Sequence, residues 1–277
     1  MNKEPFECKI ITPMFMSGPD GKTLELRPPS FKGMMRFWWR SIHGHLSLKD
    51  LKSKEGKIFG SSDEEIGKSK FNIHIKTEDI KSNSFSPVPH RNFKIKGISP
   101  SQEFSIIISS QHKNLDHYLR ILKLAIILGG FGKRARRGFG SIRIVEMEEI
   151  NLKVIINLIN EINGKNNYSL KNNKIGLDNN LKNEFPYIKE IQIGKEYSSW
   201  EKLIKEIDKA ASNNKCDSLG FAKKKVRLAS PIYVSVIDNS EKSYFPIIST
   251  LNTVFPQSMK NKIINYEKQN RFKEAIL

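Results

Sequence analysis

The chain has 277 residues, and its 47 Lys and Arg outnumber its 29 Asp and Glu, which gives a formal charge of +18 at pH 7. Such an excess of one sign weakens a compact fold by self-repulsion unless an acidic partner neutralises it. Nucleic acid is therefore the first candidate partner, and an anionic membrane surface is the second. No apolar run reaches the roughly 18 residues of a membrane span, and the N-terminus lacks the apolar core of a signal peptide.

The cysteine content points to a reducing compartment. Cys8 and Cys216 are the only cysteines, too few for a disulfide framework or a structural zinc site. We expect both to be small buried residues of a cytoplasmic protein. The sequence contains no H-E-x-x-H, no C-x-x-C and no dense Asp cluster, so it predicts neither a metal site nor a cofactor.

The first 150 residues alternate between strand and helix patterns in the order β-α-β-β-α-β. The predicted elements are the strand Phe6–Thr12, the helix Phe31–Leu46 with Ser30 as N-cap, the strands Phe71–Thr77 and Glu103–Ser109, the helix Asn114–Leu128 and the strand Ser141–Met147. The segment Pro87–Gly97 is expected to be an irregular loop. Because this is the ferredoxin-like order, we predict an α+β domain with an antiparallel sheet at residues 1–150.

The second half begins with an Asn- and Lys-rich region at 151–183, which we interpret as a helix followed by a mobile connection, a natural domain boundary. The elements expected after it are the strand Tyr187–Gly194, the helix Ser199–Ala211, a loop centred on Lys223–Arg227, the strands Pro231–Ile237 and Tyr244–Leu251 and the helix Gln257–Ala275. This order predicts a second ferredoxin-like domain at 151–277 that lacks its last strand.

The first predicted helix carries a stripe of cations. Its core face contains Phe31, Met35, Trp38, Ile42 and Leu46. Another face places Lys32, Arg36 and Arg40 at i, i+4 and i+8, where each like-charge pair costs roughly 0.2–0.5 kcal/mol. The stripe therefore implies good solvation, an anionic partner or acidic groups elsewhere in the fold. Trp39 beside it could stack on a base, or pack half-buried.

The stretch Gly129–Gly140, GGFGKRARRGFG, combines five glycines, four cations and two phenylalanines without a carboxylate. Glycines let a backbone approach a ligand and expose its N–H groups, and Phe131 and Phe139 could offer flat faces to bases, so the loop suits a phosphodiester. It does not match a P-loop, which ends in Gly-Lys-Ser/Thr. It runs from helix to strand, opposite to a dinucleotide fingerprint. A solvated turn that is merely basic is the alternative.

Several motifs resemble one known family. The run Ile11–Arg40, ITPMFMSGPDGKTLELRPPSFKGMMRFWWR, is similar to the N-terminal signature of the RAMP superfamily. The resemblance is strongest to the family of the first subunit of the Cmr complex, the type III-B CRISPR effector. Phe59–Ser62 (FGSS), Leu128–Ser141 (LGGFGKRARRGFGS) and Leu219–Val236 (LGFAKKKVRLASPIYVSV) resemble further elements of that family, the second of them its glycine-rich loop.

The resemblance implies two packed RAMP domains in a cytoplasmic ribonucleoprotein for antiviral defence, in which a guide RNA organises several RAMP subunits. It implies that this subunit helps hold the 3′ region of the guide and the target RNA, whereas another subunit cuts the target. Together with Trp39, Gly130 and Gly132, the matched positions give the expected RNA contacts. They are Arg27, Lys32, Arg36, Arg40, Lys133, Arg134, Arg136, Arg137, Lys223, Lys224, Lys225 and Arg227.

An enzymatic alternative stays open at this point. Some RAMP relatives cut guide precursors without metal, with a His general base and cations that stabilise the charged phosphate. His43 lies near the cationic stripe and is the candidate base. An isolated His is more often a packing or surface residue, so we expect a non-catalytic RNA-binding subunit.

Overall fold

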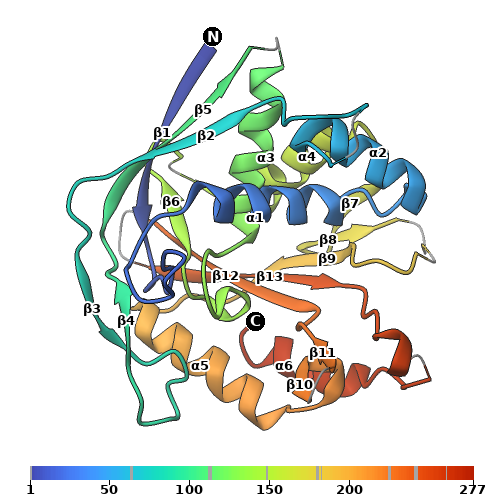
Figure 1. Cartoon of the computed structure of the whole chain (residues 1–277). Helices are drawn as coiled ribbons and strands as arrows, with labels where there is room; N and C mark the ends of the chain where they lie inside the picture. The colour runs from blue at the N-terminus through green and yellow to red at the C-terminus, as the bar shows by residue number, and fades with distance from the viewer. Residues whose placement is uncertain are drawn as a thin grey trace.

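The computed structural model describes residues 2–62, 65–111, 114–147, 149–178, 181, 183–223, 226–239, 243–259 and 261–277. Two antiparallel sheets form the framework (Figure 1). Helices α1 (Pro28–Ser41), α3 (Leu115–Leu128) and α4 (Leu152–Asn163) lie between them, and α5 (Trp200–Asn213) and α6 (Tyr266–Glu274) cover the far side of the second sheet. None of the helices in the described part of the chain is long and apolar enough to cross a membrane.

The first sheet has the strand order β2-β5-β1-β6, with each neighbouring pair antiparallel. Its strands are β1 (Asn2–Ile10), β2 (Asn72–Lys76), β5 (Glu103–Ser110) and β6 (Ile142–Ile144). This is the ferredoxin-like arrangement of a β-α-β-β-α-β unit. The predicted α+β fold is thereby confirmed, with strand ends that differ by a few residues.

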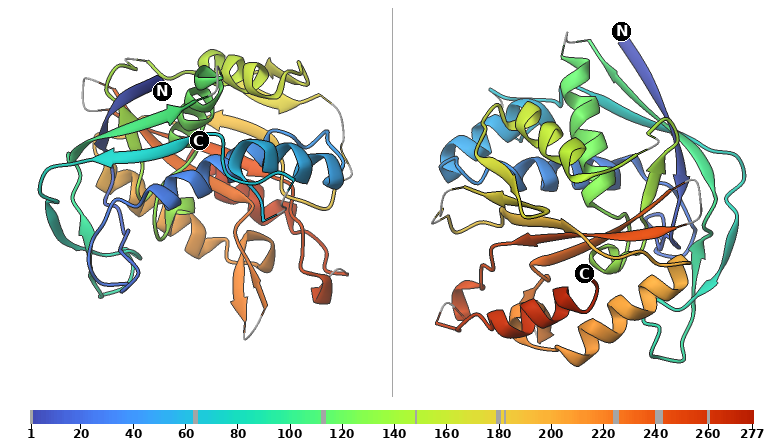
Figure 2. Two further views of the ribbon diagram at one scale, coloured as in Figure 1. Left: turned by 45° about the horizontal axis from the view of Figure 1, so that its top comes forward. Right: turned by 180° about the vertical axis from the view of Figure 1, so that it is seen from behind.

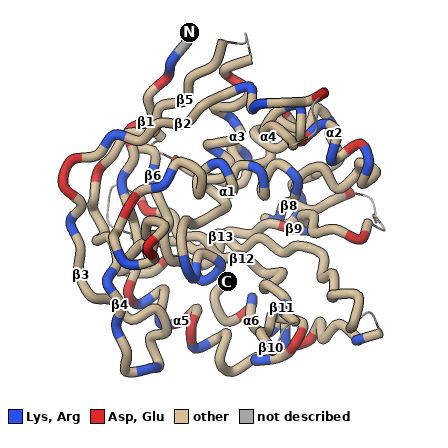
Figure 3. Tube along the Cα trace, in the orientation of Figure 1, with Lys and Arg blue, Asp and Glu red and all other residues tan. Residues whose placement is uncertain are grey.

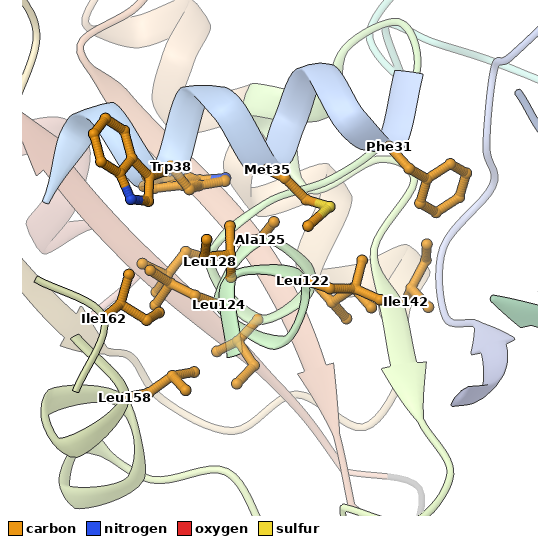
Figure 4. Close-up of a cluster of buried hydrophobic side chains, with 14 of the residues drawn as sticks. Phe31, Met35, Trp38, Leu122, Leu124, Ala125, Leu128, Ile142, Leu158 and Ile162 are labelled. Carbon is orange, nitrogen blue, oxygen red and sulfur yellow. The ribbon is translucent and has the colours of Figure 1, made fainter. Parts of the chain in front are cut away.

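Helices α1 and α3 cover this sheet. Phe31, Met35 and Trp38 of α1 are buried, as the helical spacing predicts, and Figure 4 shows Met35 pointing toward α3. The helix starts earlier than predicted, because Arg27 occupies the N-cap position and Pro28 the first turn. α3 is apolar on nearly every side, since it packs on α1, on β6 and also on β12 of the second sheet. It is a core helix shared by both halves.

Two further elements were not predicted. α2 (Leu48–Phe59) precedes β2, and its N-cap is Ser47, whose hydroxyl accepts a hydrogen bond from the Asp50 N–H. Its sequence is mostly polar, so its apolar spacing is weak. The hairpin of β3 (Ser82–Phe85) and β4 (Ile95–Ile98) replaces part of the expected irregular loop.

The second sheet has the order β12-β13-β9-β8-β7. Its strands are β7 (Tyr168–Lys171), β8 (Lys174–Leu177), β9 (Ile188–Ile193), β12 (Ile232–Asp238) and β13 (Tyr244–Leu251). The predicted mobile connection is wrong for most of its length: after α4 the chain forms the β7–β8 hairpin. Its turn, Asn172–Asn173, has φ of 50° and 55°, a conformation that asparagine tolerates. Two of the asparagines of this region thus form a turn.

β8 takes the position of the missing last strand. It pairs antiparallel with β9, with Ile175 opposite Ile191, at the place where a ferredoxin-like fold puts its fourth strand. The first sheet uses residues 2–144 and the second 168–251, on either side of the expected boundary at 150. Since α4 packs on α3, the two halves share one apolar core, and the boundary itself stays a prediction.

The remaining elements lie at the C-terminal end. The expected loop around 223–227 is a hairpin of β10 (Phe221–Lys223) and β11 (Val226–Leu228), which projects from the body (Figure 2). The last predicted helix is shorter than expected. A 3₁₀ turn at Gln257–Met259 comes first, and α6 follows after a break.

The glycine-rich loop is wedged between the two halves. The N–H groups of Lys133, Gly138 and Gly140 donate to the carbonyls of Phe15 (2.9 Å), Val234 (2.8 Å) and Pro13 (3.0 Å), respectively. The expectation that its amides face a ligand is therefore wrong for these donors. Gly140 has φ +67°, and a Cβ there would lie 2.0 Å from the Phe131 carbonyl oxygen. The glycine serves close packing of the loop against itself.

Gly140→Ala is expected to destabilise the protein by about 3 kcal/mol or more, because left-handed strain adds to a backbone clash. Gly164→Ala is the matched control: Gly164 has φ +63° but no atom within 4 Å of an added Cβ, so strain alone costs about 1 kcal/mol. Urea unfolding of both variants measures the difference. Equal losses would contradict the packing role of Gly140.

Candidate nucleic-acid interface

A pocket of about 550 Å³ lies where α1, the glycine-rich loop and the β10–β11 hairpin meet. We call it the interdomain pocket. Its walls combine aromatic and cationic side chains, and none of the described lining residues is Asp or Glu. The lining residues are Met34, Phe37, Gly132, Arg134, Ala135, Arg136, Arg137, Leu219, Gly220, Phe221, Leu228, Ser230 and Tyr233.

Arg136 is the central cation of this pocket. Its guanidinium carbon lies 5.2 Å from the ring centre of Phe37 and 5.4 Å from that of Tyr233, and it donates a hydrogen bond to the Ser230 carbonyl. Burial lowers the pKa of Arg136, an effect that the Tyr233 hydroxyl partly opposes. A half-buried guanidinium held on two aromatic faces can bind an anion and still offer a flat surface to a base.

Arg137 has a structural role. Its guanidinium donates to the Ser230 Oγ (3.2 Å), to the Ile232 carbonyl (3.2 Å) and to the Leu219 carbonyl (3.4 Å), and lies 5.1 Å from the Phe272 ring centre. Burial, followed by the neighbouring arginine charges, lowers its pKa to about 10, so it stays protonated at neutral pH. Its donors satisfy carbonyls of the second half of the chain, which makes it an anchor between the halves.

Arg134 and Lys133 lie at the outer edge of the loop. Arg134 has a left-handed backbone with φ 64°. Its Nε donates to the Pro87 carbonyl (3.0 Å), and its Nη2 lies 3.7 Å from a carboxylate oxygen of the buried Asp208. Burial lowers the pKa of Arg134, while Asp208 opposes that shift. Lys133 and Gly132 are exposed, so Lys133 presents its charge to solvent.

The expected stacking residues of the loop are core residues, which corrects the prediction. Phe131 is 0% exposed and stacks on Phe31 with ring centres 4.3 Å apart; Phe139 is 2% exposed and packs on Phe15. Gly130 is also buried, and its N–H donates to the Tyr233 hydroxyl oxygen (3.4 Å). None of these three residues presents a surface to a nucleic acid.

Trp39 is likewise buried, at 2% exposure, and stacks on His43. Of the two alternatives for Trp39, packing is correct.

The aromatic residues that do line the interdomain pocket are Phe37, Phe221 and Tyr233. Phe37 lies outside the 31–35–38–42 spacing of the core face, which was a usable sequence signal. Tyr233 was hidden within an apolar strand pattern.

The cationic stripe of α1 is partly neutralised inside the fold. Glu55 of α2, which is buried, places its carboxylate 3.2 Å from Arg36 Nε and 2.9 Å from Arg40 Nη1. The alternative of acidic partners is therefore correct for these two arginines, although one carboxylate faces two cations. Lys32 lies 5.0 Å from the Phe71 ring centre, and burial together with Arg36 lowers its pKa.

Lys32 and Arg36 also line a second pocket of about 610 Å³, on the other side of α1. We call it the α1–α2 pocket. Its wall includes the FGSS element, in which the Gly60 carbonyl accepts a hydrogen bond from Arg36 (2.8 Å). The other lining residues are Phe59, Ser61, Ser62, Gly67, Lys68, Ser69 and Asn72. A third cation, Lys68, thus joins the two from α1. Arg40 lies outside both pockets.

The other expected RNA contacts are dispersed. Arg27 is partly buried at the N-cap of α1. Lys223 forms an ion pair with Asp217 (2.8 Å), and Arg227 is exposed on β11. Lys224 and Lys225 lie outside the described residues. Along the Cα trace, blue segments follow α1 and the glycine-rich loop (Figure 3).

The histidine of the enzymatic alternative is turned into the core. His43 is 5% exposed, its Nδ1 lies 2.6 Å from the Trp39 carbonyl oxygen, and burial lowers its pKa to about 4. This neutral imidazole lies in neither pocket. His90 is held by Asp208, and His112 lies outside the described residues. Among the described residues, no three His, Cys, Asp or Glu side chains converge as metal ligands.

Comparisons with known proteins identify relatives of this chain. Residues 7–143 match the RAMP superfamily. The CRISPR system Cmr subunit Cmr1-2 of Pyrococcus furiosus is 32% identical over 186 residues, which cover 52% of this chain and 96% of that protein.

Two solved structures share the fold. The crystal structure of Cmr1 from Pyrococcus furiosus in its apo form matches with a TM-score of 0.63 and 18% identity, covering 100% of this chain and 97% of that chain. A chain in the cryo-electron microscopy structure of the type III-B Cmr-beta complex bound to cognate target RNA matches with a TM-score of 0.59 and 13% identity, covering 99% of each chain.

The burial of His43 predicts that the stability of the folded protein depends on pH. Because its pKa is about 4 in the folded protein and 6.5 for a freely solvated histidine, its contribution to stability is complete above about pH 6.5 and is lost as the pH falls toward 4. Burial lowers the pKa of His45 and His117 as well. Between about pH 7 and pH 5 we expect His43 alone to account for about 2 kcal/mol of lost unfolding free energy.

His43→Asn should remove that share of the pH dependence, since it deletes the titrating ring but keeps a donor for the Trp39 carbonyl. His74→Asn on the exposed face of β2 is the matched control. Urea unfolding at several pH values measures the slopes. An H43N protein with the slope of the unmodified protein would show that His43 is not buried as a neutral group.

Proposed function

The chain belongs to the RAMP superfamily, and within it to the Cmr1 family, and from that premise we propose that it is an RNA-binding subunit of a type III-B CRISPR effector complex. Its role would be to hold the 3′ region of the guide RNA and the target RNA without cutting either. The observation that carries this proposal is the interdomain pocket, in which Arg136 rests on Phe37 and Tyr233.

The chemistry of that pocket suits one nucleotide of a longer strand. Single-stranded RNA is bound by cations that meet phosphates and by flat side chains on which bases stack, and the pocket offers both within about 550 Å³. Arg136 provides charge inside the pocket, the exposed Lys133 adds charge next to the lining residue Gly132, and Phe37 and Phe221 provide apolar faces.

The side chains that line the interdomain pocket are better suited to binding RNA than to cleaving it. None of its described lining residues is His, Asp or Glu, the groups that most often act as a general base. The candidate base of the enzymatic alternative, His43, is buried elsewhere. In the complexes that the resemblance implies, guide–target pairing reads the sequence, so contacts to phosphates and to base faces are sufficient for this subunit.

The relative found in the Cmr-beta structure belongs to a complex bound to cognate target RNA. That structure supports the same setting for this chain, whose fold matches over its whole length. We therefore expect weak sequence preference, binding of guide or target RNA, and contacts with other RAMP subunits in the cytoplasm.

The replacement of Lys133 and Arg136 by Gln in one variant should weaken binding of single-stranded RNA by about tenfold or more. Loss of two phosphate contacts should also reduce the slope of log K against log salt by about 1.4, at about 0.7 per phosphate for single strands. Fluorescence anisotropy with labelled oligouridylate over a salt series measures both. Arg137 is left unchanged, because its loss would disturb the fold.

The matched control replaces Lys3 on β1 and Lys153 on α4 by Gln, because both are exposed and lie outside the two cationic pockets. It removes the same charge and should leave affinity and slope nearly unchanged. Equal losses in the two double variants would show that only net charge matters. Cleavage of the RNA to 2′,3′-cyclic phosphate ends in EDTA, abolished by His43→Ala, would replace the proposal with the nuclease alternative.

A further inference from the structure

Gly33 is an anomaly in the middle of α1. It is the sixth residue of a 14-residue helix and is exposed. Glycine weakens a helix interior relative to alanine. An added Cβ would have no atom within 4 Å, and φ of Gly33 is not among the positive values. Neither packing nor backbone conformation within this chain accounts for the glycine.

Its place on the helix is specific. Phe31, Met35 and Trp38 point into the core (Figure 4), and at 3.6 residues per turn Gly33 lies about 160° around the axis from Met35. It therefore lies on the outward face. It also lies one turn before Arg36 and Phe37, about 60° and about 40° from them around the axis.

Those two neighbours belong to different pockets. Arg36 lines the α1–α2 pocket with Lys32 and Lys68, whereas Phe37 lines the interdomain pocket with Arg134 and Arg136. α1 thus separates two cationic pockets, and Gly33 is the position on its outward face that carries no side chain. A polyanion that occupies both pockets must cross the helix, and it can approach the main chain most closely at this glycine.

We propose that Gly33 is the point at which the sugar–phosphate backbone of bound RNA crosses α1, passing from the interdomain pocket to the α1–α2 pocket directly against the helix main chain. This inference rests on the proposed function, and it adds a second pocket and a path to it. RNA is favoured over a protein partner because cations line both pockets and no described Asp or Glu lines either of them.

Gly33→Ala and Gly33→Leu test the crossing. Because each new side chain enters open space, both variants should fold with a melting temperature equal to or above that of the unmodified protein. RNA affinity should nevertheless fall in the order of side-chain size. For Leu we expect a loss of about tenfold, which is about 1.4 kcal/mol. Anisotropy with labelled oligouridylate and thermal unfolding of the full chain measure the two effects.

Gly176→Ala and Gly176→Leu are the matched controls, since Gly176 of β8 also has no atom within 4 Å of an added Cβ. They should leave RNA affinity unchanged. If the unmodified protein binds RNA and the Lys133/Arg136 variant weakens binding, but Gly33→Leu binds normally, the crossing is wrong and the proposed function stands. If the unmodified protein does not bind RNA, the proposed function itself fails.

A third readout separates RNA from a protein partner. In a reconstituted effector complex, Gly33→Leu should assemble as the unmodified protein does and should lose RNA contact. Normal RNA affinity combined with failed assembly would identify the outward face of α1 as a subunit contact and would overturn the crossing.

Discussion

The hydrogen bonds of Arg137 to the second half of the chain are the constraint on which the rest of the structure depends. One guanidinium binds Ser230, Ile232 and Leu219 and lies over Phe272. It thereby fixes the glycine-rich loop against β12 and α6. With α3 buried against both sheets, this anchor sets the distance between α1 and the β10–β11 hairpin, and so forms the interdomain pocket.

A dense group of like charges is stable here because each cation has a different environment. Arg137 is bound by carbonyls, Arg136 rests on aromatic rings, and Arg134 meets Asp208. On α1, Glu55 is shared between two arginines. These contacts satisfy hydrogen-bond donors but leave more positive than negative charge at the surface, as the composition of the chain requires. Internal ion pairing and RNA binding are thus compatible. Arg134, Arg36 and Arg40 meet carboxylates within the fold, whereas Arg136 has no carboxylate among the contacts described above.

The sequence predicted the ferredoxin-like order of the first half well, because strong periodicity in Phe31–Ile42 and Leu115–Leu128 marks both helices. It failed where the tertiary context decides. Phe131 and Trp39 lie beside cations in the chain, yet both are buried. The glycine-rich loop packs Phe131 against Phe31, whereas Trp39 of α1 stacks on His43. β8, which precedes β9 in the chain, takes the position of the fourth strand, which would normally follow the last helix. The order of the predicted elements gives no sign that an earlier strand fills this position.

Ultraviolet crosslinking of RNA to the assembled complex, with the crosslinked peptides mapped by mass spectrometry, tests the central claim most directly. The predicted crosslinks lie in α1 around Phe37 and in the β10–β11 hairpin around Phe221, at the walls of the interdomain pocket. The buried Phe131 and Trp39 should carry none. Crosslinks confined to α4 and the β7–β8 hairpin, which lie toward the viewer when the molecule is seen from behind (Figure 2), would contradict the assignment of the pocket as the RNA-binding surface.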